Sequence, residues 1–201
     1  MSKKKPKYRM YRDIQFEKIA KKHHFSYSYN DEFSIINLLR DFRLFSKWSS
    51  KKITNILGKK SELQELKFYI FDFEYGIWNG ENEDKFTQTV FFVQSKKLAL
   101  PHFFMEPQGF YTKGEKMVGT NDLYFEAFPK FMDQYRLQGK EEKEIRKVMS
   151  DNLLQYFSVE KDWSLEGLNY FMIFYKKDKI IPTTDLMDFY QKGKEIVKMF
   201  S

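Results

Sequence analysis

The sequence predicts an α+β fold, a single domain in which an antiparallel β-meander is flanked by helices. Of its 201 residues, 42% are hydrophobic and 19% are aromatic. These fractions are too high for a disordered chain and sufficient to build one core. Segments with strand-like alternation and segments with helical spacing follow one another without an internal repeat. This mixture is typical of an α+β domain.

Residues 1–12 are basic and show no apolar period, so they are predicted to form a mobile tail ahead of a domain over residues 13–201. A helix is expected to begin at Asp13 as its N-cap and to run to about residue 24, because apolar side chains recur there at helical spacing. The next elements expected are a strand over 25–29, a short helix within 33–48 and a strand over 53–57.

A β-hairpin is the clearest local prediction. Residues 68–78 and 86–94 are rich in strand formers, and Asn79-Gly80 between them favours a two-residue type I′ turn. That turn places Glu74 opposite Lys85, an ion pair that supports the register.

The second half of the chain alternates between strands and helices. Residues 106–121 contain three glycines and are predicted to be a long loop or a subdomain seam. The remaining expected elements are strands over 101–105, 163–165 and 170–175, and helices over 141–149, 151–157 and 184–200.

Positive charge is concentrated near the N-terminus. Residues 1–60 hold 16 Lys and Arg against 5 Asp and Glu, a net charge of +11, whereas residues 61–201 hold 19 against 23, or −4. The binding residues predicted from this excess fall into a tail group and a second group that also contains a tryptophan. They are Lys3, Lys4, Lys5, Lys7, Arg9 and Arg12, followed by Arg40, Arg43, Lys47, Trp48, Lys51 and Lys52.

This charge pattern predicts a non-enzymatic interaction module whose basic N-terminal region docks on an acidic protein or an anionic membrane surface. Nucleic-acid binding through the same region is the alternative, since aromatic rings alternate with cations at residues 8–12. A tail that only aids solubility would show the same composition. The second group fits either a membrane-surface helix or an ordinary helix of the domain.

Catalytic signals are few. Asp72 and Glu74 lie two residues apart in an apolar strand and project from one face, which makes a hydrolase the third hypothesis. Cysteine is absent, and the histidines are only His23, His24 and His102. A metal site joining His102 to Asp72 or Glu74 is a minor alternative, so no metal and no cofactor is predicted. The segment 114–121 has the glycine spacing of a phosphate-binding loop but lacks its lysine.

The sequence contains no apolar run of membrane-spanning length and no apolar core of a signal peptide in its first 30 residues. We therefore expect a cytoplasmic protein that can be peripheral at the inner face of the membrane.

Five motifs occur in order along the chain, namely NILGKK, FDFEYG, PHFFMEPQG, YRLQGKEE and WSLEG. Through them the chain resembles a family of uncharacterised bacterial α+β proteins over about residues 14–198. The resemblance implies an α+β domain. Some such proteins carry hydrophobic N-terminal segments that place them at a membrane, whereas this chain begins with a basic segment. The resemblance implies no activity and assigns no residue a catalytic role.

Overall fold

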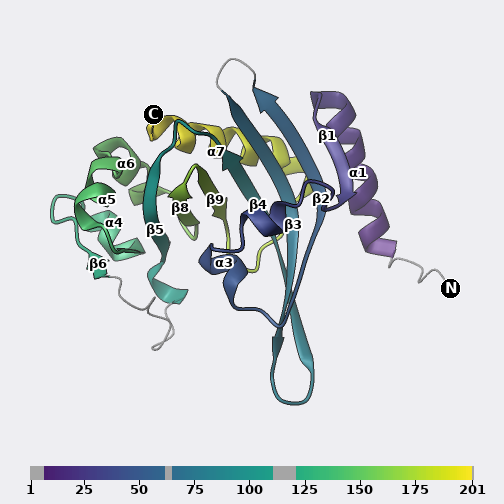
Figure 1. The fold of residues 1–201 in the computed structure, drawn as a ribbon, viewed down its shortest axis with the longest axis horizontal. Helices are drawn as coiled ribbons and strands as arrows, with labels where there is room; N and C mark the ends of the chain where they lie inside the picture. The colour runs from purple at the N-terminus through teal and green to yellow at the C-terminus, as the bar shows by residue number, and fades with distance from the viewer. Residues whose placement is uncertain (1–6, 62–64, 111–120, 201) are drawn as a thin grey trace.

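The structure, a computed structural model, describes residues 7–61, 65–110 and 121–200, without the side chains of residues 7–10 and 110 (Figure 1). Its strands are β1 (Ser26–Asn30), β2 (Ser50–Ser61), β3 (Leu66–Trp78), β4 (Glu83–Gln94), β5 (Leu100–Pro107), β6 (Asn121–Leu123), β7 (Tyr135–Gly139), β8 (Ser164–Asn169) and β9 (Phe171–Tyr175). Its helices are α1 (Lys7–His23), α2 (Ile35–Leu38), α3 (Arg43–Ser46), α4 (Pro129–Gln134), α5 (Glu142–Val148), α6 (Asp151–Val159) and α7 (Leu186–Met199), with short 3-10 turns at Gln108–Phe110 and Thr183–Asp185.

Within the described residues, nine strands form one antiparallel sheet in the order β1-β2-β3-β4-β9-β8-β5-β7-β6. The first four strands make a meander, and β9 then joins β4 to the remaining strands. The predicted α+β class, with an antiparallel meander and flanking helices in one domain, is confirmed.

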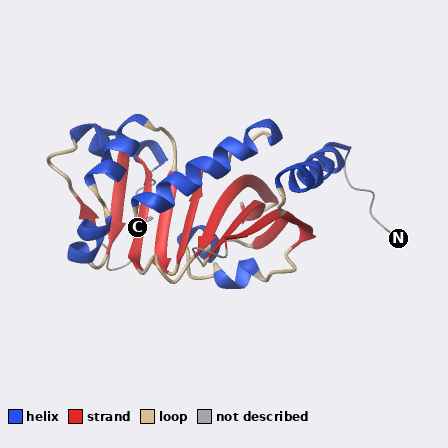
Figure 2. Ribbon diagram, turned by 90° about the horizontal axis from the view of Figure 1, so that it is seen from above, coloured by secondary structure: helices blue, strands red, loops and turns tan. Residues whose placement is uncertain are grey.

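A separate hydrophobic core lies on each face of the sheet. The first face is covered by α1 and by α4 to α7, and the second face by α2 and α3 (Figure 2). Along β3, Phe68 and Ile70 point to the first face, whereas Phe71 and Phe73 point to the second. Because both faces are covered, central strands are apolar on both sides.

The N-terminal helix begins earlier than predicted. The expected start at Asp13 is wrong, because α1 begins at Lys7. Residues 7–12 are therefore helical and do not form the mobile tail that was predicted, whereas residues 1–6 lie outside the described residues. Within α1, Arg12, Phe16 and Ala20 are buried against the sheet, and they share one side of the helix because they are four residues apart.

The central hairpin forms, but its predicted register is wrong. Trp78 pairs with Glu83, so Glu74 lies opposite Thr87 and not opposite Lys85. The turn is longer than two residues because the side chain of Asn79 accepts hydrogen bonds from the backbone N–H groups of residues 81 and 82. The shift preserves the faces, and Lys85 Nζ still lies 3.6 Å from Glu74 Oε1 as a diagonal neighbour.

Three elements of the second half are absent from the sequence-based prediction, namely α4, β6 and β7. Strand β7 carries Arg136 and Gln138, which are 8% and 1% exposed. The sequence YRLQG alternates apolar and polar residues as a strand does, and the sequence-based prediction missed this short signal. The predicted loop over 106–121 lies partly outside the described residues, and its last residue, Asn121, begins β6, which pairs with β7 of the same sheet.

Helix α7 approaches the sheet closely at Gly193. A Cβ atom at this position would lie 2.5–2.6 Å from three ring atoms of Phe91. We expect Gly193→Ala to lower the free energy of unfolding by about 1–3 kcal/mol, because overpacking outweighs the gain of up to about 1 kcal/mol in helix propensity. Urea denaturation measures this. Gly109→Ala is the control, since a Cβ there meets nothing within 4 Å, and equal losses in both variants would contradict the prediction.

Candidate functional site: the docked N-terminal helix and its polar cavity

Arg12, predicted as a binding cation of a mobile tail, is instead buried, with 6% of its surface exposed. Its guanidinium forms a bidentate ion pair with Asp72 of β3, with Nε–Oδ2 and Nη2–Oδ1 distances of 2.7 Å each. Nη1 also donates to the carbonyl oxygen of Ile181 at 2.9 Å, and Nη2 to Thr89 Oγ1 at 3.0 Å. The guanidinium carbon lies 4.9 Å from the ring centre of Phe16. Arg12 therefore fastens α1 to the sheet and to the segment before α7.

The carboxylate of Asp72 is held by further donors. Thr89 Oγ1 donates to Asp72 Oδ1 at 3.0 Å, and Asn55 Nδ2 donates to Oδ2 at 3.1 Å. Asn55 lies at a β-bulge of β2 and has a φ of 55°, a left-handed conformation that asparagine tolerates. A bulge re-aims a side chain, and here it turns the Asn55 amide toward Asp72.

A polar cavity of about 240 Å³ lies beside this ion pair, between α1 and the sheet. Its lining includes Arg12 and Lys52, which were predicted to bind an anion, together with Asp72 and Glu74, which were predicted as an acid pair. The remaining lining residues are Asp13, Tyr29, Thr54, Asn55, Thr87 and Ile180. The structure thus brings the residues of two separate hypotheses to one place.

The acidic side chains Asp72 and Glu74 of this cavity are already paired with cations of the protein. Both oxygens of Asp72 accept hydrogen bonds from described groups, and Glu74 pairs with Lys85. Burial and the carboxylates of Asp13 and Glu17 raise the pKa of the neighbouring Tyr27 hydroxyl, which stays protonated and donates to Asn55 Oδ1 at 3.1 Å. Asp72 therefore acts as a positioning group for α1, and we do not propose the acid pair as a hydrolytic site.

Arg43, from the second predicted group, is also buried. Its Nη1 lies 3.4 Å from Glu106 Oε1, and its guanidinium carbon lies 4.2 Å from the ring centre of Phe104. The backbone N–H groups of Arg43 and Leu44 donate to the carboxylate of Glu166 on β8, at 2.8 and 3.1 Å. This buried acid therefore holds the start of α3 against the second face of the sheet.

Complete burial raises the pKa of the Glu166 carboxyl to about 7, although the donors from Arg43 and Leu44 lower it. The hydroxyl of Tyr175 lies 3.2 Å from Glu166 Oε1, and burial raises its pKa as well. With a pKa of about 7, Glu166 changes its charge near neutral pH. Its role in this environment is structural.

The other residues of the second group lie at the surface or near it. Lys51 Nζ donates to the carbonyl oxygen of Phe45 at 2.8 Å, and Lys52 Nζ lies 5.8 Å from the ring centre of Tyr29.

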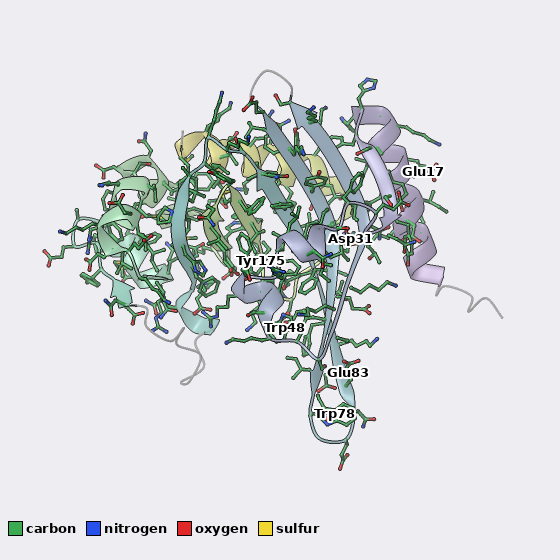
Figure 3. All side chains as sticks on the ribbon, viewed as in Figure 1. Glu17, Asp31, Trp48, Trp78, Glu83 and Tyr175 are labelled. Atoms are coloured by element: carbon green, nitrogen blue, oxygen red, sulfur yellow. The ribbon has the colours of Figure 1, made fainter. Side chains whose placement is uncertain are left out.

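Trp48 packs on Tyr75, with ring centres 4.0 Å apart, and lies beside α3, as does Tyr175 (Figure 3). Lys47 is exposed, and so is Arg40, whose Nε lies 3.7 Å from an oxygen of Asp41. The group is therefore split between two faces of the sheet.

The tail group is divided as well. Lys3, Lys4 and Lys5 lie outside the described residues. Lys7 and Arg9 lie in α1, and their side chains are outside the description. The cations that α1 displays in the structure are Lys18, Lys21 and Lys22, all exposed, and none of the three was predicted as a binding residue.

The outer side of α1 also exposes two apolar side chains. Tyr11 is 63% exposed and Ile14 is 47% exposed. By helical periodicity both lie on the side that carries the exposed Lys18 and Lys21, opposite to the buried Phe16 and Ala20. Glu17 points outward from the same helix (Figure 3). Sequence reasoning missed this surface because the helical spacing of residues 11, 14, 18 and 21 becomes visible only once residues 7–12 are known to be helical.

The predicted alternative of a metal bound by His102 with Asp72 or Glu74 is wrong. His102 lies on β5, and three strands separate β5 from β3 in the sheet. Among the described residues, no group of three or more His, Cys, Asp or Glu side chains is placed to hold a metal ion. No helix in the described part of the chain is long and apolar enough to cross a membrane.

Comparison with known proteins identifies a shared fold. The chain matches no family model and no curated protein. It is similar to the crystal structure of the mycobacterial trehalose monomycolate transport factor A, with a TM-score of 0.62 over 94% of this chain and 91% of that chain, at 13% sequence identity. An identity this low shows a common fold alone.

Proposed function

We propose that this protein is a non-enzymatic interaction module that binds an anionic membrane surface through its N-terminal region. The observation that carries the proposal is the outer side of α1, called here the α1 surface and defined as Tyr11, Ile14, Lys18, Lys21 and Lys22. These exposed side chains combine apolar groups with cations on a helix whose opposite side is already docked.

Membrane binding explains this combination better than the alternatives do. Tyrosine and isoleucine side chains enter the headgroup region while neighbouring lysines pair with anionic lipids, and each lysine near the surface contributes about 1 kcal/mol. Nucleic acid uses cations and aromatic rings but has no need of an exposed isoleucine.

The position of α1 supports the same proposal. It is the outermost element at one end of the sheet (Figure 1). Lys3, Lys4 and Lys5 precede the start of α1 in the sequence, so their charges add to the attraction.

Vesicle co-sedimentation tests the proposal, with phosphatidylcholine vesicles compared with vesicles that also contain phosphatidylglycerol. We expect the protein to bind only the anionic vesicles and to lose affinity as salt rises. The variant Lys18→Gln/Lys21→Gln/Lys22→Gln should bind at least about tenfold more weakly and with a flatter salt dependence. Tyr11→Ser/Ile14→Ser should also weaken binding while keeping its salt dependence.

The matched control removes three exposed lysines at the other end of the sheet, in the variant Lys130→Gln/Lys140→Gln/Lys143→Gln. This control should bind as the unchanged protein does. The proposal fails if the unchanged protein does not bind anionic vesicles at low salt, or if the control loses as much affinity. Binding of single-stranded RNA with a higher affinity than vesicles, lost in the α1 triple variant, would establish the nucleic-acid alternative instead.

A further inference from the structure

A second surface, remote from the polar cavity, combines an apolar hollow with lysines. It is a cavity of about 300 Å³ on the first face, between the start of β3, the residues after β4 and the last two turns of α7. Leu66, Phe68, Leu98 and Val197 line it, each at most 9% exposed. Lys97, Lys194 and Lys198 line it as well. We call these seven residues, with Ser95, the α7 hollow.

The lysines of the α7 hollow carry charge that the described residues do not neutralise. None of the three forms an ion pair within the described part of the chain. Lys194 and Lys198 are four residues apart on α7, so two like charges share one side of the helix, an arrangement that weakens a helix. The nearest aromatic contact places Lys194 Nζ 5.4 Å from the ring centre of Tyr190.

A purely structural explanation covers only part of this arrangement. A cation in the last turn of a helix interacts favourably with the helix dipole, which accounts for Lys198. It does not account for Lys97, which comes from the turn after β4, on another wall of the hollow. Three cations around an apolar hollow are instead complementary to a ligand that has an apolar part and an anionic end.

We propose that the α7 hollow binds a single acyl chain with an anionic head group. The chain would lie against Phe68, Leu98 and Val197, and the carboxylate or phosphate head would lie among the ammonium groups of the lysines, whose methylene stems also cover apolar surface. This ligand chemistry is shared by free fatty acids and by the single-chain phospholipids of a membrane. The inference does not depend on the α1 surface, which lies on another element.

Isothermal titration with laurate, below its micelle concentration, tests this proposal on the full chain. We expect laurate to bind, and dodecyl maltoside, which has the same chain and no charge, to bind at least tenfold more weakly. Hexanoate should also bind weakly, because affinity rises by roughly fourfold for each methylene that enters the hollow. Lys194→Gln/Lys198→Gln should weaken laurate binding at least tenfold without loss of folding, since both side chains lie at the surface.

The control variant is Lys143→Gln/Lys147→Gln, which removes two lysines at the same spacing from α5 and should leave laurate binding unchanged. The triple lysine variant of the α1 surface should also bind laurate normally, so this proposal and the proposed membrane function fail separately. Absence of laurate binding, or equal loss in the α5 control, overturns the inference, as does loss of binding only in the α1 variant.

A second measurement identifies the source of the ligand. Native mass spectrometry after incubation with vesicles that contain both laurate and lysophosphatidylglycerol should recover the protein with one of the two bound. A laurate complex assigns a free fatty acid, and a lysophosphatidylglycerol complex assigns a membrane lipid. Recovery of the protein with neither ligand contradicts the proposal.

Discussion

Replacing Arg12 by methionine is expected to lower the free energy of unfolding by about 3–5 kcal/mol, because it leaves the carboxylate of Asp72 buried without its partner. The two groups share two hydrogen bonds of 2.7 Å, and both residues are at most 6% exposed. Urea denaturation measures the loss. Hydrogen exchange shows whether α1 separates from the sheet before the rest unfolds, in which case the amides of α1 lose protection first.

The double variant Arg12→Met/Asp72→Asn separates the ion pair from the packing of the arginine. We expect it to recover part of the lost stability, since a neutral amide no longer leaves a buried charge. A double-mutant cycle completed with Asp72→Asn then gives the coupling energy of the pair. A loss below about 1 kcal/mol in Arg12→Met would contradict the prediction, because only an exposed ion pair is worth so little.

The same variant bears on the proposed function. If Arg12 fastens α1 to the sheet, then Arg12→Met changes the position of the α1 surface without altering any of its side chains. The lysines keep their charge, so the variant should still bind anionic vesicles at low salt. A coincident loss of binding would show that the docked position of the helix is required.

Stability is expected to fall by about 3 kcal/mol as pH rises from 4.5 to 7, through Glu166 alone. Its pKa is raised from 4.5 to about 7 in the folded protein, so the folded state keeps a proton that the unfolded state releases in this range. This stabilising contribution is therefore fully present below pH 4.5 and is lost as pH rises toward about 7. Above that pH, Glu166 causes no further change in the free energy of unfolding.

Glu166→Gln isolates this effect from every other titrating group. The amide oxygen of glutamine still accepts from the backbone of Arg43 and Leu44, and it carries no proton to lose. The difference in unfolding free energy between the unchanged protein and the variant should therefore shift in favour of the variant between pH 4.5 and 7. A difference that stays flat over this range would show that the acid ionises in the folded state with an ordinary pKa.

Local pattern was sufficient for the central hairpin. Residues 68–78 and 86–94 are predicted as strands because their strand formers are continuous. The structure gives the reason for these continuous runs, since both faces of β3 and β4 are covered. The predicted turn was too short because the side chain of Asn79 organises four residues, and a preference for Asn-Gly turns does not include such side-chain bonds. Partners along the hairpin were therefore wrong while the faces were right.

Long-range contacts were the part that sequence reasoning could not supply. Arg12 and Asp72 are 60 residues apart, and the donor of Arg43 and its acceptor Glu166 are 123 apart. Arg12 and Arg43 are both predicted as binding residues from the sequence, because net charge along a sequence does not show which cations have a buried partner. A signal for the first pair was present in Asp72, since an acid in an apolar strand requires a cation or several donors.

Buried polar side chains on the second face lie in the strands that the sequence-based prediction omitted or made too short, β7 and β8. Arg136, Gln138 and Glu166 are buried in short strands, although polar residues that alternate with apolar ones usually mark the wet face of a strand. Their hydrogen bonds come from elements distant in sequence, and burial follows from the sheet as a whole. These residues become understandable only once the order of the nine strands is known.

The pairing of β4 with β9 has a consequence for how the chain is made. Val90 pairs with Tyr175, so the middle of the sheet closes only after most of the chain has left the ribosome. Until then β4 presents an open edge of valine and phenylalanine, the kind of edge on which chains aggregate. The contacts that complete both cores span a large sequence separation, which slows folding. A nascent chain that ends before β9 is therefore the form most in need of a chaperone.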